Sequence, residues 1–383
     1  MRFTSTTSLA SRNVRRVAVV FNDDSVAATS DQNDGDEDAE PPSPPKDVAD
    51  ADVADVAACI HGVLKRAGHE VVLLSVKDSL TPLIDSLRAL RIERVFNLVE
   101  SIGGESRREA EIPRLLDELR IPYTGNSAGI LRLAQAKDMA KRLLEFHGVP
   151  VPRGYAVVDA RELTCPEARG LVYPLFVKPA RTDASIGIDR TSVVCDRAQL
   201  DARLTYLSRH LEGPFVVEEY LPGREINVAI FADPYRGQLV PTEVDFSGYP
   251  ADYPPIVTYD CKWVPGSPEY VARSLPATER LTPAELHAVR WAARAAFLTL
   301  GGTSYGRVDL RFDANGVPRV IDVNPNNDLN PEAGMAIAAA SVGMSHDSLI
   351  NALLDGATVE ARHVPAPHHA ARPRSVGHAA AAY

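Results

Sequence analysis

Residues 305–324 read YGRVDLRFDANGVPRVIDVN, two runs of alternating apolar and polar residues on either side of Asn315-Gly316. Asn-Gly between two such runs predicts a β-hairpin, because a type I′ turn needs positive φ at both of its central residues. Placing this pair at the centre of the turn fixes the register of the hairpin. Asp309 then faces Asp322 across the two strands.

The same register places Arg307 opposite Asn324, on the face that carries the two aspartates. Facing carboxylates repel each other, so a positive group is expected between them. Two carboxylates and an amide oxygen are hard ligands that suit Mg²⁺ held together with phosphates, whereas a solvated hairpin face is the alternative interpretation. The opposite face is apolar and is expected to cover a core with Val308, Leu310, Phe312, Ile321 and Val323.

Length and composition indicate an ordinary globular protein of two or three domains, with 383 residues and 45% hydrophobic content. No apolar run is long enough for a transmembrane helix, so no membrane partner is expected. The first 16 residues lack the apolar segment of a signal peptide. The cysteines are far apart, show no metal-site spacing and fit a reducing cytoplasm, which is the expected location; they are Cys59, Cys165, Cys195 and Cys261.

The net charge of −10 comes almost entirely from one segment. Residues 23–55 contain twelve acidic residues and one lysine, so the rest of the chain is close to neutral. Without a basic surface, no nucleic-acid partner is expected. Lysine is scarce, with seven against 34 arginines, which makes each lysine in an ordered segment worth attention.

The first part of the chain alternates strands and helices. Strands are expected at 16–21, 71–76 and 94–99, with helices at 47–67 and 80–90 between them. This rhythm predicts a small doubly wound α/β domain with a parallel sheet, whose ligands lie beyond the carboxyl ends of the strands. The acidic, Pro-rich residues between the first strand and the first helix are expected to form a disordered insertion.

Further elements are expected along the rest of the chain. A capping box at Thr282 and Glu285 predicts the start of a helix that ends near Gly301. The Tyr/Pro/Gly-rich residues 247–268 are expected to form a long functional loop. The other expected helices are 128–147 and 333–357, and the other expected strands are 173–179, 215–220 and 225–231.

Four segments carry a family resemblance when they are taken in order. They are FNLVESIGGE with IPYTGN (96–105 and 121–126), FVKPARTDASIGI (176–188), VVEEYLPGREINV (216–228), and YGRVDL with VIDVNPN (305–310 and 320–326). Together they resemble the ATP-grasp carboxylate–amine ligases, and among these the D-alanine–D-alanine ligase family. The resemblance runs from about residue 15 to about residue 357.

The resemblance implies an α/β (α+β) chain with the ATP-grasp fold. A doubly wound amino-terminal α/β domain would precede two α+β subdomains that clamp ATP. The implied divisions are a disordered arm at 1–14, the amino-terminal domain at 15–130 with its insertion at 23–46, a central subdomain at 131–212, a carboxyl-terminal subdomain at 213–358, and a disordered tail at 359–383.

The resemblance also assigns roles to individual residues. Lys137, Lys178 and Lys262 would contact the ATP phosphates, Lys262 by closing over the γ-phosphate from its loop. Other residues implied to bind ATP are Ser185 in the loop after Lys178, Glu218 and Leu221 at the adenine, and Glu225 at the ribose.

The resemblance implies that residues of the hairpin bind the metal ion and stabilise the transition state. Asp309, Asp322 and Asn324 match Mg²⁺ ligands, and Arg307 matches a residue that stabilises the tetrahedral oxyanion. The family usually has glutamate in place of Asp322, which leaves open whether one ion or two would bind. Mn²⁺ is an alternative to Mg²⁺.

The resemblance weakens at the substrate pockets. Ala333 stands where the family has a serine that holds a carboxylate, and Glu100 stands where it has a histidine. A glycine-rich segment with an ammonium-binding glutamate is missing near Asn22. Glu100 and Asp328 are the candidate substrate contacts, and Asp328 favours an ammonium or amide over a carboxylate.

These observations predict an ATP-dependent carboxylate–amine ligase that forms an amide or peptide bond through an acyl phosphate. The substrates would be a small carboxylate and a small amine, and a homodimer is left open. Two alternatives remain at this point. One is D-alanine–D-alanine ligase proper, and the other is a regulator that binds ATP without catalysis.

Overall fold

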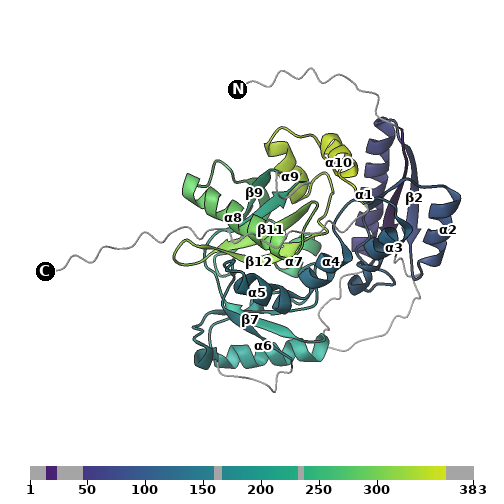
Figure 1. The fold of residues 1–383 in the computed structure, drawn as a ribbon. Helices are drawn as coiled ribbons and strands as arrows, with labels where there is room; N and C mark the ends of the chain where they lie inside the picture. Colours follow the sequence, from purple (N-terminus) through teal and green to yellow (C-terminus); the bar gives the residue numbers. More distant parts are fainter. Residues whose placement is uncertain (1–13, 24–45, 159–165, 232–236, 359–383) are drawn as a thin grey trace.

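The computed structural model describes residues 14–23, 46–158, 166–231 and 237–358 (Figure 1). Apart from their edge residues, the predicted disordered arm, insertion and tail lie outside these ranges. Among the described residues, no helix is both long enough and apolar enough to span a membrane.

The amino-terminal sheet is parallel with strand order β2-β1-β3, as the alternating pattern predicted. Alternate residues of the central strand enter two different cores, which is the period of two expected for a strand. Val17 and Val19 pack on the side of α1, while Ala18 and Val20 pack on the side of α2. The elements are β1 (Arg16–Asn22), α1 (Lys46–Arg66), β2 (Glu70–Val76), α2 (Thr81–Ala89) and β3 (Arg94–Asn97).

Two antiparallel sheets follow. The first has the order β4-β7-β5-β6 and the second the order β10-β9-β8-β11-β12. The first sheet comprises β4 (Gly154–Val157), β5 (Leu175–Pro179), β6 (Val193–Val194) and β7 (Phe215–Glu219). The second comprises β8 (Glu225–Ile230), β9 (Leu239–Asp245), β10 (Arg273–Pro276), β11 (Gly306–Phe312) and β12 (Pro318–Asn324).

The predicted boundary between residues 212 and 213 remains a proposal. Because β7 pairs with both β4 and β5, a boundary after Glu219 would keep the four-stranded sheet whole.

Two long predicted helices are each divided into two. The first breaks at Ala136, where the next residue, Lys137, donates its backbone N–H to Ala180 O at 3.1 Å instead of continuing the helical ladder. The second breaks near Gly343, whose φ of +79° favours glycine. The resulting helices are α4 (Ala128–Gln135), α5 (Lys137–Phe146), α9 (Gly334–Ser341) and α10 (His346–Asp355).

Other helices are either as predicted or new. The capping box holds in α8 (Pro283–Thr299), since Glu285 accepts the Thr282 N–H and donates its own N–H to the threonine hydroxyl. The sequence did not reveal α3 (Glu111–Leu119) or α6 (Arg197–His210), and the long loop contains a short α7 (Tyr259–Trp263).

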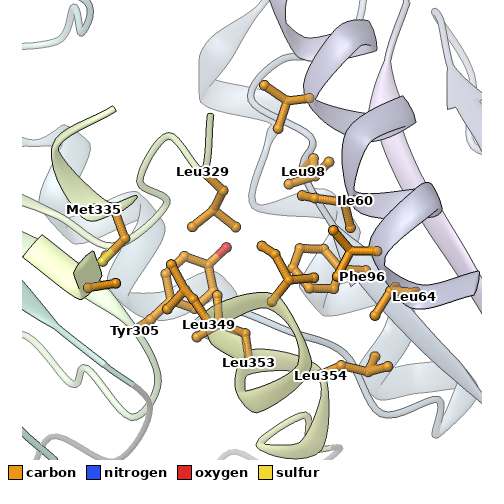
Figure 2. Close-up of a cluster of buried hydrophobic side chains, with 14 of the residues drawn as sticks. Ile60, Leu64, Phe96, Leu98, Tyr305, Leu329, Met335, Leu349, Leu353 and Leu354 are labelled. Atoms are coloured by element: carbon orange, nitrogen blue, oxygen red, sulfur yellow. The ribbon is translucent and has the colours of Figure 1, made fainter. Parts of the chain in front are cut away.

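One apolar core joins the amino-terminal sheet and its helix α1 to the last two helices, α9 and α10 (Figure 2). Ile60 and Leu64 of α1 and Phe96 of β3 pack in the same cluster as Leu349 and Leu353 of α10. Burying these side chains against one another stabilises the contact between the amino-terminal sheet and the last two helices. The site described below depends on this contact, because its walls come from both parts.

Candidate active site

A single cavity of about 980 Å³ is lined by side chains from all three sheets and the loops between them. Every residue that the sequence singled out for chemistry lies on its wall. These residues are Glu100, Lys137, Lys178, Ser185, Glu218, Leu221, Glu225, Lys262, Arg307, Asp309, Asp322, Asn324 and Asp328.

The hairpin register is as predicted at the end that lines the cavity. Arg307 pairs with Asn324 and Asp309 with Asp322, and the register shifts by one residue between Asp309 and Leu310. The four polar side chains therefore share one face of the hairpin.

The predicted type I′ turn is wrong. Among its central residues only Gly316 has positive φ, at +75°, and Asn315 does not. The carboxylate of Asp313 accepts the N–H groups of Asn315 and Val317 at 2.8 and 2.9 Å, which stabilises a wider turn. The bulge then restores the register on the cavity side.

The bulge also moves one side chain to the other face. Ile321 was expected in the core, but Val320 occupies that position and Ile321 lines the cavity. The Ile321 carbonyl accepts a hydrogen bond from Lys178 at 3.1 Å. A register shift of one residue exchanges the two faces of a strand.

Protein cations already offset the charges of the two facing aspartates. Arg307 donates to both oxygens of Asp309 at 2.6 and 2.9 Å, and Lys137 Nζ lies 3.8 Å from Asp322 Oδ2. Burial alone would raise the pKa of Asp322, but Lys137 and two further lysines outweigh burial and lower it. Repulsion between the carboxylates therefore does not by itself require a metal ion.

The donor set nevertheless fits a hard divalent cation. Asp309, Asp322 and Asn324 present carboxylate and amide oxygens to the same cavity, which is the ligand type that Mg²⁺ prefers. No group of three or more His, Cys, Asp or Glu side chains suited to a metal occurs within the described residues. A metal here would therefore depend on the amide and on phosphate oxygens.

Lys137 connects the hairpin to the loop after β5. Its ammonium donates to Asp183 Oδ1 at 2.6 Å and to Thr182 O at 2.8 Å. Burial alone would lower the pKa of Lys137, but Asp322 and Asp183 outweigh burial and raise it. A permanently charged amine at this position suits contact with phosphate oxygens.

The loop after β5 has a strained backbone. Ala184 and Ser185 both have left-handed φ, at +56° and +61°, although neither is glycine. Strain of this kind clusters at ligand-binding loops. Trp263 of α7 donates to Ala184 O at 2.9 Å, and Ser185 donates to Val257 O at 3.3 Å, so the long loop and this loop close over the cavity together.

Lys262 enters the cavity from α7, and its side chain remains accessible to solvent there. The surrounding protein and nearby Arg307 both disfavour the charged amine, which lowers its pKa. An added anion such as a phosphate would reverse that effect by stabilising the ammonium.

Glu218 of β7 lies between two lysines. Lys178 Nζ is 3.3 Å from the carboxylate, and Lys141 of α5 contacts its other oxygen. Burial lowers the pKa of Lys141 to about 8, whereas the two lysines outweigh burial and lower the pKa of Glu218. The lowered pKa of Lys141 and the lowered pKa of Glu218 are consistent, because a single carboxylate is shared by two ammonium groups. The cluster of these three side chains therefore carries more positive than negative charge.

Lys141 was not among the candidate residues identified from the sequence. Two signals pointed to it: it is one of only seven lysines, and it lies four residues after Lys137, on the same face of a helix. Four of the seven lysines therefore surround the cavity or its wall.

Leu221 and Glu225, which the family resemblance implies at the nucleoside, also line the cavity. Leu221 is buried there, and Glu225 of β8 pairs with Arg311 at 3.2 Å. Burial raises the pKa of Glu225 despite the arginine. These residues offer an apolar surface beside a few fixed polar groups, as ligand pockets do.

The two candidate substrate residues lie at the exposed part of the cavity wall. Glu100 follows β3, and Asp328 follows β12. Asp328 Oδ1 accepts the N–H of Asn330 at 2.7 Å, so one of its oxygens already holds the local turn.

Glu109 is a further carboxyl group on the cavity wall that the sequence did not reveal. Burial raises its pKa from an ordinary value of 4.5 to about 8. The folded state therefore holds this proton at higher pH than the unfolded chain does, and the free energy of unfolding should fall as pH rises from about 4.5 to about 8.

The pH effect can be measured against a variant without this proton. In Glu109→Gln, the free energy of unfolding should lack the fall that Glu109 causes over this pH range, which amounts to roughly a few kcal/mol. Urea unfolding of both proteins between pH 5 and 8 measures the difference. Parallel curves would contradict the expectation.

Asn126 bonds to the backbone at the open end of the hairpin, just before β11 and just after β12. This buried side chain donates to Tyr305 O at 2.7 Å and Pro325 O at 2.8 Å. Its oxygen accepts the N–H groups of Thr303 and Ser304 at 3.0 and 3.1 Å. Its loop follows the amino-terminal sheet, so the amide fixes the hairpin relative to that sheet.

Asn126→Ala should be strongly destabilising because it leaves several buried backbone groups without partners. Each such group costs about 1–3 kcal/mol, so a total loss of about 3 kcal/mol or more is expected. Urea unfolding measures it. The control is Ser127→Ala at the next residue, whose side chain makes no cap bond to α4; an equal loss in the two variants would contradict the role of the amide.

Comparisons with known proteins place the chain in a family. Residues 144–355 match the model described as "D-ala D-ala ligase C-terminus". A protein of Sinorhizobium fredii, "Uncharacterized protein y4sG", is 30% identical over 78% of this chain and 86% of its own length. A D-alanine–D-alanine ligase of Synechococcus is 27% identical over 82% of this chain and 91% of its own length.

A solved structure agrees on the fold. The D-alanine–D-alanine ligase of Bacillus anthracis, crystallised with ATP, superposes with a TM-score of 0.66 at 19% identity, over 90% of this chain and 97% of that one.

The fold and the cavity are those of an ATP-grasp ligase, an ATP-dependent enzyme, as predicted. The chain belongs to the D-alanine–D-alanine ligase family.

Proposed function

We propose that this enzyme uses MgATP to activate a small carboxylate as an acyl phosphate and then joins it to a small amine. The observation that carries the proposal is the cavity itself, where several lysine and arginine side chains and a pair of facing carboxylates lie beside one strained loop. Phosphoryl transfer needs this combination of charge and positioning.

The proposed roles follow from the positions of the side chains. Lys137, Lys178 and Lys262 offset the charge of the phosphates, and the loop with Ser185 covers them. Leu221 contacts the adenine and Glu225 the ribose. Glu218, predicted at the adenine, is engaged by two lysines, so its proposed role is to keep them in place beside the nucleotide.

Asp309, Asp322 and Asn324 would hold Mg²⁺, which when bound would lower the negative charge that the attacking carboxylate meets. Arg307, fixed by Asp309, is aimed by the hairpin into the same cavity. Its guanidinium offsets the negative charge that develops when the amine attacks the acyl carbon.

The reaction has two steps. A carboxylate oxygen attacks the γ-phosphorus and ADP leaves. The uncharged amine then attacks the acyl carbon, inorganic phosphate leaves, and the nitrogen loses a proton to give the amide. We further propose a cytoplasmic location, since ATP and the free cysteines both fit it, and homodimerisation remains a hypothesis.

The proposal is tested by ADP release over all pairs of amino acids, with and without the second substrate. Release that requires both a carboxylate and an amine supports a ligase. ATP binding without substrate-dependent release for any pair would favour a regulator that only binds ATP.

Free D-alanine should be a poor second substrate. Ala333, at the start of α9, lines the cavity and offers no side-chain donor to a carboxylate. One missing hydrogen bond to a charged group costs roughly 1.5–3 kcal/mol, which corresponds to about tenfold to a hundredfold in kcat/KM. Phosphate release with D-alanine alone, compared with basic and amide-bearing amines, measures the preference. Efficient formation of D-alanyl-D-alanine with no better amine would contradict it.

A further inference from the structure

Glu109 is held in one orientation on the cavity wall. It follows the 3₁₀ turn Ser106–Arg108, and the residue is 8% exposed. Its two oxygens accept hydrogen bonds from Gln135 Nε2 at 2.9 Å and Asn326 Nδ2 at 3.2 Å.

The two amides that hold Glu109 are themselves anchored. Gln135 gives its other N–H to Ser106 O at 2.8 Å, and Asn326 gives its other N–H to Val99 O at 2.9 Å. Both donors are neutral, so they orient the carboxyl group without offsetting its charge. A carboxylate has about four acceptor positions, and these two bonds leave the others available.

Glu109 differs from the other buried glutamates in having no cationic partner. Across the described ranges, each of the others forms an ion pair: Glu218 with Lys141 and Lys178, Glu225 with Arg311, Glu243 with Arg224 and Arg280, and Glu269 with Arg190. The acidic groups Asp183 and Glu100 act on the Glu109 carboxyl in the same direction as burial and raise its pKa further. Buried carboxylates are normally paired, so an unpaired one facing a cavity needs a reason.

Asn327 supplies an independent observation. It is 4% exposed and lines the same cavity, yet its side-chain oxygen has no hydrogen-bond partner within the described part of the chain. Its Nδ2 donates to Asp328 O at 3.1 Å, so the amide orientation is set and the oxygen remains as a vacant acceptor.

We propose that Glu109 binds the ammonium group of a substrate, with the side-chain oxygen of Asn327 as a further acceptor that lines the same cavity. This inference rests on the proposed ligase function. An ammonium has three donors and no acceptor, which matches a wall of acceptors. An anionic group is disfavoured there by Glu109 and Glu100, whereas Asp183 is paired with Lys137.

The ammonium could belong to either substrate. It could be the α-ammonium of the acid that is phosphorylated, or that of the amine before it loses its proton. Glu109 would recognise the ammonium group in the same way in both cases. In the first case the KM for the acid depends on Glu109, and in the second case the KM for the amine does.

The variant is Glu109→Gln, which keeps the size of the side chain and one acceptor but cannot take on the negative charge that Glu109 gains when a bound ammonium lowers its raised pKa. The matched control is Glu105→Gln in the same loop, since Glu105 pairs with Arg107 at 2.6 Å and does not line the cavity. Urea unfolding at pH 7 shows first that both variants fold.

The acid side is tested by trapping the acyl phosphate with hydroxylamine, an amine that is uncharged at neutral pH. The probes are D-alanine, L-alanine and L-lysine, each against the analogue without an α-ammonium, propionate or 6-aminohexanoate. If Glu109 holds the α-ammonium, the wild type prefers the amino acids and Glu109→Gln raises their KM about tenfold to a hundredfold. The KM for ATP and for the analogues stays unchanged.

The amine side is tested with the best acid at saturation, using methylamine against hydroxylamine. If Glu109 holds the attacking amine as its ammonium, Glu109→Gln raises the KM for methylamine alone. Unchanged KM values for every probe in Glu109→Gln, or equal changes in Glu105→Gln, would overturn the inference while leaving the ligase function intact.

A wild type that releases no phosphate with any probe would instead refute the proposed function. In that event, calorimetric titration of the same amino acids and analogues, in the presence of a nonhydrolysable ATP analogue, decides the subsite. Binding of an amino acid at least tenfold tighter than its analogue, lost in Glu109→Gln, supports the subsite. Equal binding overturns it.

Discussion

Asp322→Asn is expected to lower ATP turnover at least about 100-fold while the protein remains folded. Removing one preorganised charged group from a site of charge development costs about 10²–10³ in kcat. The fold should survive because Lys137 keeps Asp183 as its partner at 2.6 Å and the facing Asp309 loses a repulsive neighbour. Steady-state ADP release and urea unfolding measure the two effects.

The same substitution at Asp309 should behave differently. Asp309 is bound by both arms of the Arg307 guanidinium, so Asp309→Asn leaves a largely buried arginine without its partner. We expect loss of turnover together with a measurable loss of stability.

A control on the same hairpin separates site effects from hairpin effects. Asp313→Asn weakens the pair with Arg319 at the turn, and Asp313 does not line the cavity. It should cost stability but leave turnover within about twofold once the protein is folded. Full Mg²⁺-dependent turnover in both Asp309→Asn and Asp322→Asn would refute the hairpin as the metal site.

The hairpin shows what local sequence can and cannot predict. Alternation and Asn-Gly gave the correct facing pairs at the cavity, yet they missed the wider turn and the bulge. Both departures depend on contacts outside the alternation pattern. The Asp313 side chain ties the turn, and the bulge lies where Leu310 pairs with β8 as well as with β12.

The divided helices have the same explanation. Residues 128–147 carry a continuous helical pattern, but the N–H of Lys137 bonds to Ala180, 43 residues further along the chain. That bond aims Lys137 at the hairpin. Nothing within the helix sequence specifies it, so the break could not be predicted.

Candidate residues were found by type and order, but their pairing was not. Scarce lysines and recurring motifs identified cavity residues that we propose contact the phosphates. Two lysines share Glu218 only because β5, β7 and α5 come together. Glu109 meets two neutral amides only because the turn before α3, the end of α4 and the loop after β12 come together. The acidic wall of the substrate end was invisible for that reason.

Glu218→Gln is expected to destabilise the protein by about 3 kcal/mol or more. Glu218 is 2% exposed, and its charge serves two buried ammonium groups, those of Lys141 and Lys178. Removing one partner from a buried ion pair leaves uncompensated charge, which costs about 3–5 kcal/mol. Urea unfolding at pH 7 measures the loss.

The double variant Glu218→Gln/Lys141→Met tests whether charge is the cause. Lys141→Met alone leaves Glu218 with Lys178 as partner, at 3.3 Å, and should cost less than Glu218→Gln. In the double variant only one unpaired ammonium remains, so the loss should be smaller than the sum of the two single losses. If the losses simply add, the destabilisation comes from packing. Glu218 raises the pKa of Lys141, so in Glu218→Gln that pKa should fall below its value of about 8. The variant should then recover part of its stability as pH rises through the lowered pKa, because the unpaired amine can lose its proton inside the fold.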